Sequence, residues 1–316
     1  MRILFVFSGN SAQKISPFIE EQINSLLDIG IDVDKFAIIG KGITGYLSNL
    51  KRFFNTIHNK KYNLIHAHYI WSIIFALFQV KIPVVGTFHG SDLMQNMTFF
   101  LAKNFVIPRL NKAIVVNERM AIKLHSPKVI ILPCGVNVNL FIPNNSVTTN
   151  LSLNKNKINI LFSSNFQRPE KNYNLAKQAI DLLQQHIDLN LIELKGFNRN
   201  EVSDLLNQVD LLLMTSIWEG SPQIIKEAMA CNCPIVSTNV GDVKWLLDGV
   251  EGCFITTNDP KDVADKIKKA LNFKGRTKGR DKLISLGLDS EHIAKKIIKV
   301  YEEVINNTSG KRVYGR

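Results

Sequence analysis

The chain has 316 residues, of which 45% are hydrophobic and 21% are charged, and this composition excludes an intrinsically disordered protein. Its length allows two domains of ordinary size. The longest apolar stretch, Tyr69–Val80, is too short to span a bilayer and predicts a buried helix instead. The N-terminus lacks a signal-peptide pattern, and the four cysteines lack disulfide-scaffold or metal-binding spacing. We therefore expect a cytoplasmic protein with reduced thiols.

The net charge of +12 is unevenly distributed along the chain. Residues 1–150 carry 15 basic and 7 acidic side chains, residues 151–260 carry 9 and 13, and residues 261–316 carry 15 and 7. A basic excess of this kind suits an anionic partner such as a nucleotide or a phospholipid surface, and the alternative is that it only maintains solubility. Few aromatic residues accompany the basic segment at 271–282, so we do not expect nucleic acid as a partner.

Short apolar segments alternate with amphipathic segments of helical length from the first residue onward. In the first half, the predicted helices include residues 18–30, and the predicted strands are residues 3–8, 34–39, 63–68, 83–88, 113–116 and 129–133. A polar stretch without periodicity, Pro143–Asn159, then separates the two halves and is typical of a linker.

The second half repeats the alternation. Its predicted helices are residues 175–186, 200–208, 260–272 and 291–306, and its predicted strands are residues 158–163, 189–194, 210–215, 234–238 and 252–256. Continuously apolar strands that alternate with helices indicate parallel sheets buried on both faces. The predicted fold class is therefore α/β, with two doubly wound, Rossmann-like domains that face each other across a cleft.

Two glutamates mark the most informative motif, because they flank a turn where a ligand is expected. In doubly wound sheets, ligands bind beyond the carboxyl ends of the strands, near helix N-termini. Glu219 lies in the turn after the strand at 210–215, and Glu227 lies two turns inside the next helix. We expect Pro222 as the first helical residue and Ser221 as its cap. Two carboxylates and a free helix N-terminus suit a nucleotide-linked sugar. The alternative is a solvated helix residue and an ordinary acid near the cap.

This motif and three others resemble the retaining glycosyltransferases of family four. Glu219 and Glu227 are followed by AMACNCPIVSTNVG, which is similar to the C-terminal signature of that family. SSNFQRPEKN (Ser163–Asn172) resembles its R-x-x-K element, and PCGVNVNLFIP (Pro133–Pro143) resembles the run that opens its interdomain linker. IHAHY and TFHGSD, which contains His89 and Asp92, resemble two of its strand ends. The resemblance extends from Met1 to about Asn306.

The resemblance implies the GT-B fold and its domain organisation. It places an acceptor-side domain at residues 1–142, a linker at 143–157 and a nucleotide-sugar-binding domain at 158–289. A C-terminal helix at 290–307 then crosses back to the first domain, and residues 308–316 form a tail. The family inserts a strand and a helix after the segment Leu191–Gly196, which this chain lacks. We therefore expect a shortened second domain.

The resemblance also implies roles for individual residues. Arg168 and Lys171 would bind the donor diphosphate, and Glu227 would hold the ribose hydroxyls. Glu219 would hold the transferred sugar, together with the turn formed by Gly220, Ser221, Pro222 and Gln223. The catalytic residues would be His89, which faces the sugar, with Glu219, Arg168 and Lys171. Gly9 would lie where the first loop approaches the phosphates. Because negative charge develops on a departing nucleoside diphosphate, fixed cations stabilise its transition state. The alternative is that Arg168 and Lys171 belong to a solvated face.

The predicted function is a metal-independent, retaining transfer of a hexosyl or related sugar from a nucleotide-sugar to a saccharide or lipid-linked acceptor. No cofactor is expected, since the nucleotide-sugar is a substrate. The implied context is cell-envelope polysaccharide synthesis, with a basic face of the acceptor domain resting on the inner side of an anionic membrane. A nucleotide-sugar epimerase of the same fold and a donor-binding protein without turnover are the alternatives.

Three other patterns give weaker evidence of a ligand site. Gly40, Gly42 and Gly45 form a GxGxxG, but it follows the second strand and has no later acidic partner, which disfavours an NAD site. Asp32 and Asp34 form a DxD at the strand end away from the crevice, which favours solvated acids over a metal site. His66 and His68 share one strand face without an evident third ligand, so we expect polar groups that line a cleft rather than a metal pair.

Overall fold

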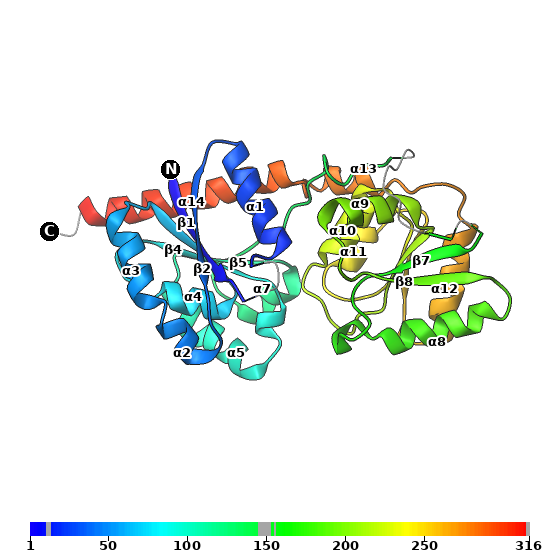
Figure 1. Cartoon of the computed structure of the whole chain (residues 1–316). Helices are drawn as coiled ribbons and strands as arrows, with labels where there is room; N and C mark the ends of the chain where they lie inside the picture. Colours follow the sequence, from blue (N-terminus) through cyan, green and yellow to red (C-terminus); the bar gives the residue numbers. More distant parts are fainter. Residues whose placement is uncertain (11–13, 145–152, 155, 314–316) are drawn as a thin grey trace. The chain divides into compact units, whose positions relative to one another are not determined.

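The computed structural model describes residues 1–10, 14–144, 153–154 and 156–313. The chain forms two compact units: unit 1 contains residues 1–135 and 290–316, and unit 2 contains residues 136–289. Most of the linker predicted at 143–157 lies outside the described residues. Figure 1 shows each unit as a sheet flanked by helices.

Unit 1 is built on a six-stranded sheet in the order β2-β1-β3-β4-β5-β6, in which all neighbours pair in parallel. Its strands are β1 (Arg2–Ser8), β2 (Asp32–Ile38), β3 (Leu64–His68), β4 (Val84–Phe88), β5 (Lys112–Val115) and β6 (Val129–Ile131). Both β3 and β4 are buried along their whole length, because helices cover both faces of such a sheet. The predicted strands of this half are confirmed.

Helices enclose this sheet. They are α1 (Pro17–Asp28), α2 (Gly42–Leu47), α3 (Leu50–Asn59), α4 (Ile70–Ala76), α5 (Asn96–Leu101), α6 (Ile107–Arg109), α7 (Glu118–Leu124) and α14 (Ser290–Val313), with the short helix η1 (Ser91–Leu93) and the π-helical turn η2 (Ala102–Val106). The apolar stretch Tyr69–Val80 forms α4, whose buried side chains include Ile73 and Phe75. Within the described ranges, no helix has both the length and the apolar character needed to cross a membrane.

The last helix of the chain, α14, belongs to unit 1. It packs against α1, and its Tyr301 is fully buried. The helix continues to Val313 and so includes residues 308–313, which the sequence analysis assigned to a tail. No proline occurs in that segment to end the helix earlier.

Unit 2 is built on a five-stranded parallel sheet in the order β11-β10-β9-β7-β8. Its strands are β7 (Ile158–Phe162), β8 (Leu189–Glu193), β9 (Leu211–Met214), β10 (Ile235–Thr238) and β11 (Cys253–Thr256). Its helices are η3 (Pro169–Lys171), α8 (Tyr173–Gln184), α9 (Arg199–Gln208), α10 (Gln223–Ala230), α11 (Val243–Leu247), α12 (Pro260–Asn272) and α13 (Gly279–Ser285). A short connection, residues 194–198, joins β8 directly to α9, and this is the shortening that the sequence predicts.

Each sheet has one point where the strand order reverses. In unit 1 it lies between β1 and β3, since β1 pairs with both β2 and β3. In unit 2 it lies between β7 and β9, since β7 pairs with both β8 and β9. The connections at the carboxyl ends of these strands diverge and leave a crevice where ligands of doubly wound folds bind.

Candidate active site

A buried ion pair lies at the carboxyl edge of the unit 2 sheet, in the two connections that flank its switch point. Lys171 ends η3, which follows β7, and Glu219 lies in the turn that follows β9. Nζ of Lys171 lies 2.5 Å from Oε1 of Glu219, and the two side chains are only 9% and 13% exposed. Ser216 Oγ donates to the same carboxylate oxygen over 2.7 Å. Two of the predicted site residues therefore meet in one place.

Hydrogen bonds between the two connections fix this pair. Thr215 Oγ1 donates to the carbonyl oxygens of Lys171 and Asn172, over 3.1 Å and 3.0 Å. The backbone N–H of Ile217 donates to the carbonyl oxygen of Glu170 over 2.9 Å. Asn172 has a φ of +52°, a left-handed conformation that asparagine tolerates better than most residues. The backbone around both charged residues is thus held before any ligand binds.

Arg168 lies three residues before Lys171 but has a different environment. Its side chain is 54% exposed, and it forms an ion pair with Glu170, with Nε 2.7 Å from Oε1. The connection after β7 therefore carries one buried and one exposed cation, both among the predicted diphosphate ligands.

The turn that leads into α10 departs from the sequence prediction. The helix begins at Gln223, so Pro222 is the residue before it rather than its first residue, and no side chain caps it. Pro222 keeps an extended conformation with ψ of 117°, which delays the helix by one residue. The buried Ser221 hydroxyl therefore does not cap the helix; it lies close to the Asp242 carboxylate and makes no hydrogen bond of normal geometry.

The same turn packs against the connection after β10. A Cβ atom on Gly241 would lie 2.3 Å from the carbonyl oxygen of Gly220 and 3.1 Å from that of Glu219, and Gly241 has a φ of +58°. Only glycine fits this close approach. Burial raises the pKa of the neighbouring Asp242 to about 6, although the charge of Lys226 opposes this shift. Asp242 was not among the predicted site residues, because it lies one position beyond the signature that ends at Gly241.

A second ion pair joins the buried Glu227 to the partly exposed Arg199. Arg199 Nη1 lies 2.7 Å from Oε1 of Glu227, whose side chain is 3% exposed. The Arg199 guanidinium also lies over the ring of Phe141, with Cζ 4.6 Å from the ring centroid. Arg199 is the first residue of α9, which is capped by Asn198 and Glu201. Arg199 was not among the predicted site residues, although its position directly after the shortened connection was the available signal.

In unit 1, His89 follows β4 at the carboxyl edge, and Asp92 holds the backbone around it. The Asp92 carboxylate accepts hydrogen bonds from the backbone N–H groups of His89, Gly90 and Ile70, over 3.0 Å, 3.0 Å and 3.2 Å. Burial raises the pKa of Asp92 to about 6, against the effect of these hydrogen bonds. Asp92 therefore fixes the backbone at the ends of β3 and β4.

The side chain of His89 packs against the rings of Phe18, His68 and Tyr69. Its Nε2 is 3.0 Å from Nδ1 of His68, and its Nδ1 is 3.8 Å from Sγ of Cys134. His66 bonds to Tyr301 over 2.5 Å and to Thr87 over 2.7 Å.

Both strand histidines are neutral. Burial first, and the neighbouring His89 second, lower the pKa of His66 to about 3, and burial lowers the pKa of His68 well below its ordinary value. The expectation that His66 and His68 line a cleft is wrong, because both side chains are completely buried.

Gly9 packs closely against the end of β2. Its backbone N–H donates to the carbonyl oxygen of Ile38 over 2.8 Å, and a Cβ atom there would lie 2.9 Å from Cβ of Ala37. The next residue, Asn10, bonds to the backbone of Gly40. Part of the first loop, residues 11–13, lies outside the described residues.

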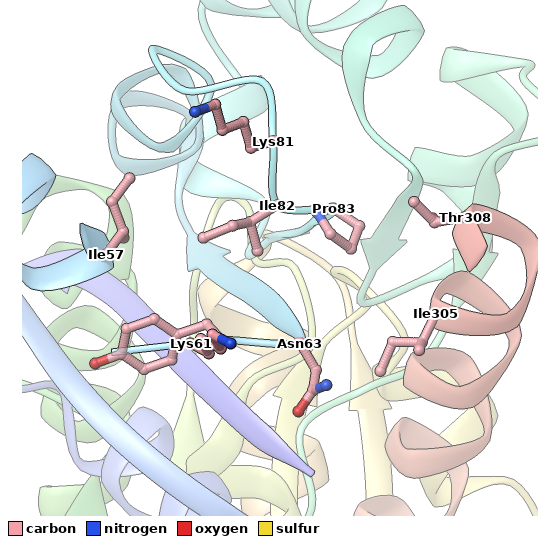
Figure 2. Close-up of a pocket in the computed structure, with 9 residues that line it drawn as sticks. Ile57, Lys61, Asn63, Lys81, Ile82, Pro83, Ile305 and Thr308 are labelled. Carbon is pink, nitrogen blue, oxygen red and sulfur yellow. The ribbon is translucent and has the colours of Figure 1, made fainter. Parts of the chain in front are cut away.

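A separate hollow of about 510 Å³ lies at the opposite, amino-terminal edge of the unit 1 sheet. Figure 2 shows that Asn63 and Pro83, which precede β3 and β4, line it together with Lys61, Lys81 and residues of α14. None of the predicted site residues lines this hollow. In the described part of the chain, no group of three or more His, Cys, Asp or Glu side chains is arranged to hold a metal ion.

Two family profiles match the sequence. The family described as Glycosyltransferase Family 4 matches residues 13–140, and Glycosyl transferases group 1 matches residues 176–272. The two matches cover most of unit 1 and much of unit 2, including α10 and the Glu219 turn.

Related sequences show the same likeness. An uncharacterized glycosyltransferase of Methanocaldococcus jannaschii is 26% identical over 84% of this chain and 82% of its own length. The N,N'-diacetylbacillosaminyl-diphospho-undecaprenol alpha-1,3-N-acetylgalactosaminyltransferase of Campylobacter jejuni is 30% identical over 34% of this chain and 30% of its own length. The phosphatidylinositol N-acetylglucosaminyltransferase GPI3 subunit of Saccharomyces cerevisiae is 27% identical over 40% of this chain and 29% of its own length.

Solved structures establish the fold. Sucrose-phosphate synthase from Thermosynechococcus elongatus superposes with a TM-score of 0.79 at 14% identity, over 97% of this chain and 100% of that one. HepE from Anabaena in complex with UDP and glucose superposes with a TM-score of 0.72 at 16% identity, over 96% and 100%. The predicted GT-B architecture, with two parallel-sheet α/β domains, is confirmed.

Proposed function

Because this chain belongs to the family 4 glycosyltransferases of group 1, we propose that it is a retaining enzyme that uses a nucleotide-sugar donor. It moves a hexosyl or related sugar to a saccharide or lipid-linked saccharide in cell-envelope polysaccharide synthesis. The observation that carries this proposal is the buried Lys171–Glu219 pair at the switch point of unit 2. Removing two charges from water costs free energy, and a buried ion pair adds little to stability by itself. We therefore infer that this pair serves to bind a charged ligand.

The donor is held by groups on the carboxyl edge of unit 2. Lys171 and the exposed Arg168 bind the diphosphate, and Glu227 accepts hydrogen bonds from the ribose hydroxyls. Glu219 and the backbone of residues 220–223 hold the transferred sugar. Arg199 neutralises Glu227 and orients its carboxylate, since the two side chains are joined over 2.7 Å. Gly9 of unit 1 approaches the phosphates, and His89 contacts the sugar.

Transfer exchanges one bond to the anomeric carbon for another. The bond between this carbon and the diphosphate oxygen breaks, and the acceptor hydroxyl oxygen forms a new bond on the same face. The acceptor proton passes to the departing phosphate oxygen, so no protein nucleophile is needed. Lys171 stabilises the charge that develops on the diphosphate, and its buried, fixed position avoids the reorganisation that water would require.

The cations of unit 2 neutralise the charge of the diphosphate, and this neutralisation supports a metal-independent reaction. Chelation of divalent cations should then leave the rate of transfer unchanged. A rate that chelation abolishes and Mg²⁺ or Mn²⁺ restores would contradict this part of the proposal.

The comparisons agree with this choice of donor and acceptor. Solved neighbours carry UDP or UDP-glucose, and two relatives are named for transfer to a diphospho-undecaprenol-linked sugar and to phosphatidylinositol. These names support a nucleotide-sugar donor and a lipid-linked acceptor, and thus a peripheral position at the inner face of the membrane. The epimerase alternative is not favoured, because the family matches and these relatives are glycosyltransferases.

The proposal is tested by incubating the protein with a panel of nucleotide-sugars and a glycolipid extract, followed by mass spectrometry of sugar and lipid products. We expect an acceptor that gains one sugar and a released nucleoside diphosphate, with retention at the anomeric carbon by NMR. Isomerised donor in the absence of acceptor would indicate an epimerase. Donor binding without any product would indicate a binding protein.

A further inference from the structure

His68 is completely buried at the end of β3, and packing fixes the orientation of its ring. Strand β3 is a central strand of the unit 1 sheet, between β1 and β4. The ring centroid of His68 lies 5.3 Å from that of Phe5, with planes at 24°, and 4.4 Å from that of His66, with planes at 31°. Because protein interiors are close-packed, a ring in this environment keeps one rotamer. His68 therefore presents Nδ1, and not Nε2, to His89.

An in-plane hydrogen bond joins His68 to His89. Nδ1 of His68 and Nε2 of His89 are 3.0 Å apart, the two ring planes differ by only 17°, and the ring centroids are 5.3 Å apart. This combination places both nitrogens between the two centroids, in a plane that the rings nearly share. The N–H bond and the lone pair of an imidazole lie in the ring plane, so one nitrogen donates to the other. Which ring donates depends on the second nitrogen of His68.

The second nitrogen of His68 identifies the donor. Within the described residues, His68 Nε2 is buried and has no hydrogen-bond partner. Burial keeps the pKa of His68 well below its ordinary value, so the ring is neutral and carries a single N–H. A buried N–H without a partner is rarer in proteins than a buried acceptor without one. The proton of His68 therefore lies on Nδ1, and His68 donates to Nε2 of His89.

The same hydrogen bond determines the state of His89. Its Nε2 accepts from His68, so the proton of a neutral His89 ring lies on Nδ1. This Nδ1 is 3.8 Å from Sγ of Cys134, and a sulfur atom is a weak acceptor. An oxygen atom of a ligand would be a stronger acceptor at this position. Of the two histidines, His89 is the partly exposed one, so it is the one that a ligand can contact.

We propose that His68 is a positioning residue that holds His89 as a neutral hydrogen-bond donor through Nδ1. A proton added to His89 would have to enter at Nε2, and it would force the proton of His68 onto its buried Nε2. His89 therefore donates to an oxygen atom of the transferred sugar and does not take the proton of the acceptor hydroxyl. This role in transfer rests on the proposed function, in which His89 contacts the sugar, whereas the position of the two protons does not.

NMR of the full chain tests the position of the protons. With nitrogen-15 in the histidine rings, the two neutral tautomers are distinguished by the chemical shifts of their two nitrogens. The variant His89→Gln identifies the signals of His89 among those of the seven histidines. We expect the Nδ1–H tautomer for His89 in the wild type at pH 7. His68→Leu removes the donor, and the His89 signals should then move toward the average of two exchanging tautomers.

Two further variants separate the hydrogen bond from packing. His68→Asn keeps an N–H donor at the same number of bonds from the backbone as Nδ1, so it should retain the Nδ1–H tautomer of His89. His66→Asn is the matched control, because His66 is a buried histidine of the same strand whose ring nitrogens bond to Tyr301 and Thr87. It should leave the tautomer of His89 unchanged.

Kinetics test the role of His68 in transfer. His68→Leu should lower kcat by about 10- to 100-fold, because a misplaced contact to the reacting sugar slows the reaction. His68→Asn should recover most of this loss. Calorimetry should give the same affinity for nucleoside diphosphate in all these variants, because the proposed diphosphate site lies in unit 2. The melting temperature shows whether each variant is folded, and the wild-type spectrum tests the proposal without any variant.

Three outcomes would overturn the proposal. They are an Nε2–H tautomer or a charged ring for His89 in the wild type at pH 7, wild-type His89 signals in a folded His68→Leu, or a folded His68→Leu with the wild-type kcat. A wild-type protein that shows the expected tautomer but transfers no sugar would instead contradict the proposed function.

Discussion

The carboxyl edges of the two sheets have the same topology but opposite chemistry. In unit 2 this edge carries two ion pairs, the buried pair Lys171–Glu219 and the partly buried pair Arg199–Glu227. In unit 1 the corresponding edge buries His66 and His68 as neutral rings, bonded to Thr87, Tyr301 and His89. The first edge suits a ligand whose charge increases during reaction, whereas the histidines of the second edge are completely buried and bond to other groups of unit 1. Under the proposed function, the diphosphate binds at the charged edge of unit 2 and the acceptor belongs to unit 1.

The same difference between the two edges predicts different effects on stability and on function. A buried ion pair is weak evidence of stabilisation, but removing one partner leaves an uncompensated charge. A buried neutral histidine instead makes the unit sensitive to acid. Substitutions at the two edges should therefore differ in the property that they change as well as in the size of the change.

The largest effect is expected from Lys171→Met. It leaves the buried Glu219 carboxylate unpaired, which should lower the free energy of unfolding by about 3–5 kcal/mol. It should also lower the rate of transfer by about 10²–10³, because a fixed cation is lost. Denaturant unfolding and product assays measure the two effects, and Lys177→Met, an exposed lysine of α8, is the control.

The double variant Lys171→Met/Glu219→Gln sharpens this result. It removes both charges and should recover most of the stability without recovering the activity. If stability and activity return together, the pair has only a structural role.

A smaller effect is expected from Arg199→Met, since Arg199 is partly exposed, with 28% of its side chain accessible. Stability should fall by about 2–3 kcal/mol as Glu227 loses its partner. Because Glu227 would no longer be oriented, the preference for ribonucleotide over 2'-deoxyribonucleotide should shrink, and calorimetry with both ligands measures it. Arg199→Lys should keep part of this preference, whereas an unchanged preference in Arg199→Met would contradict the role given to Arg199.

The neutral edge of unit 1 predicts a pH effect. The pKa of His66 is about 3 in the folded chain, below its ordinary value of 6.5, so the unfolded chain binds protons more readily. The contribution of His66 is present above about pH 6.5 and is lost as the pH falls toward 3, at about 1.4 kcal/mol per pH unit.

His66→Asn should lack this slope. The difference in unfolding free energy between the wild type and the variant, measured in urea from pH 7 to pH 4, isolates it from the opposite contributions of Asp92 and Asp242. Parallel curves over that range would show that His66 is not held neutral.

The smallest change in stability is expected from Arg168→Gln. Its ion pair with Glu170 is exposed, and such pairs contribute about 0–1 kcal/mol. Transfer should nevertheless slow by about 10-fold or more, because Arg168 binds the diphosphate. Comparison of the melting temperature with the rate checks both parts, and a stable variant with full activity would exclude Arg168 from the site.

The sequence predicted the strands because most of them are short, largely apolar segments, as expected in a sheet covered on both faces. The resemblance to family four also implied that Lys171 and Glu219 share one site, and in the structure the two residues meet in the connections that flank the switch point. The start of α10 was misplaced by one residue, because proline suits both the first helical position and the extended residue before it.

Arg199 and the burial of His66 and His68 were not predicted. Arg199 reaches Glu227 from a different segment, and the alternation of His66 and His68 on β3 does not reveal that Tyr301 of the distant α14 contacts His66. Contacts between distant segments of the chain decide both features, and local patterns do not carry them.

The central claim is that unit 2 holds the donor through the charged groups buried at its carboxyl edge. Calorimetric titration of the preferred nucleoside diphosphate into the wild type and into Lys171→Met/Glu219→Gln tests it most directly. We predict a single site in the wild type and a loss of affinity of about 100-fold in the double variant. Equal affinity in the two proteins, with the double variant folded, would contradict the account.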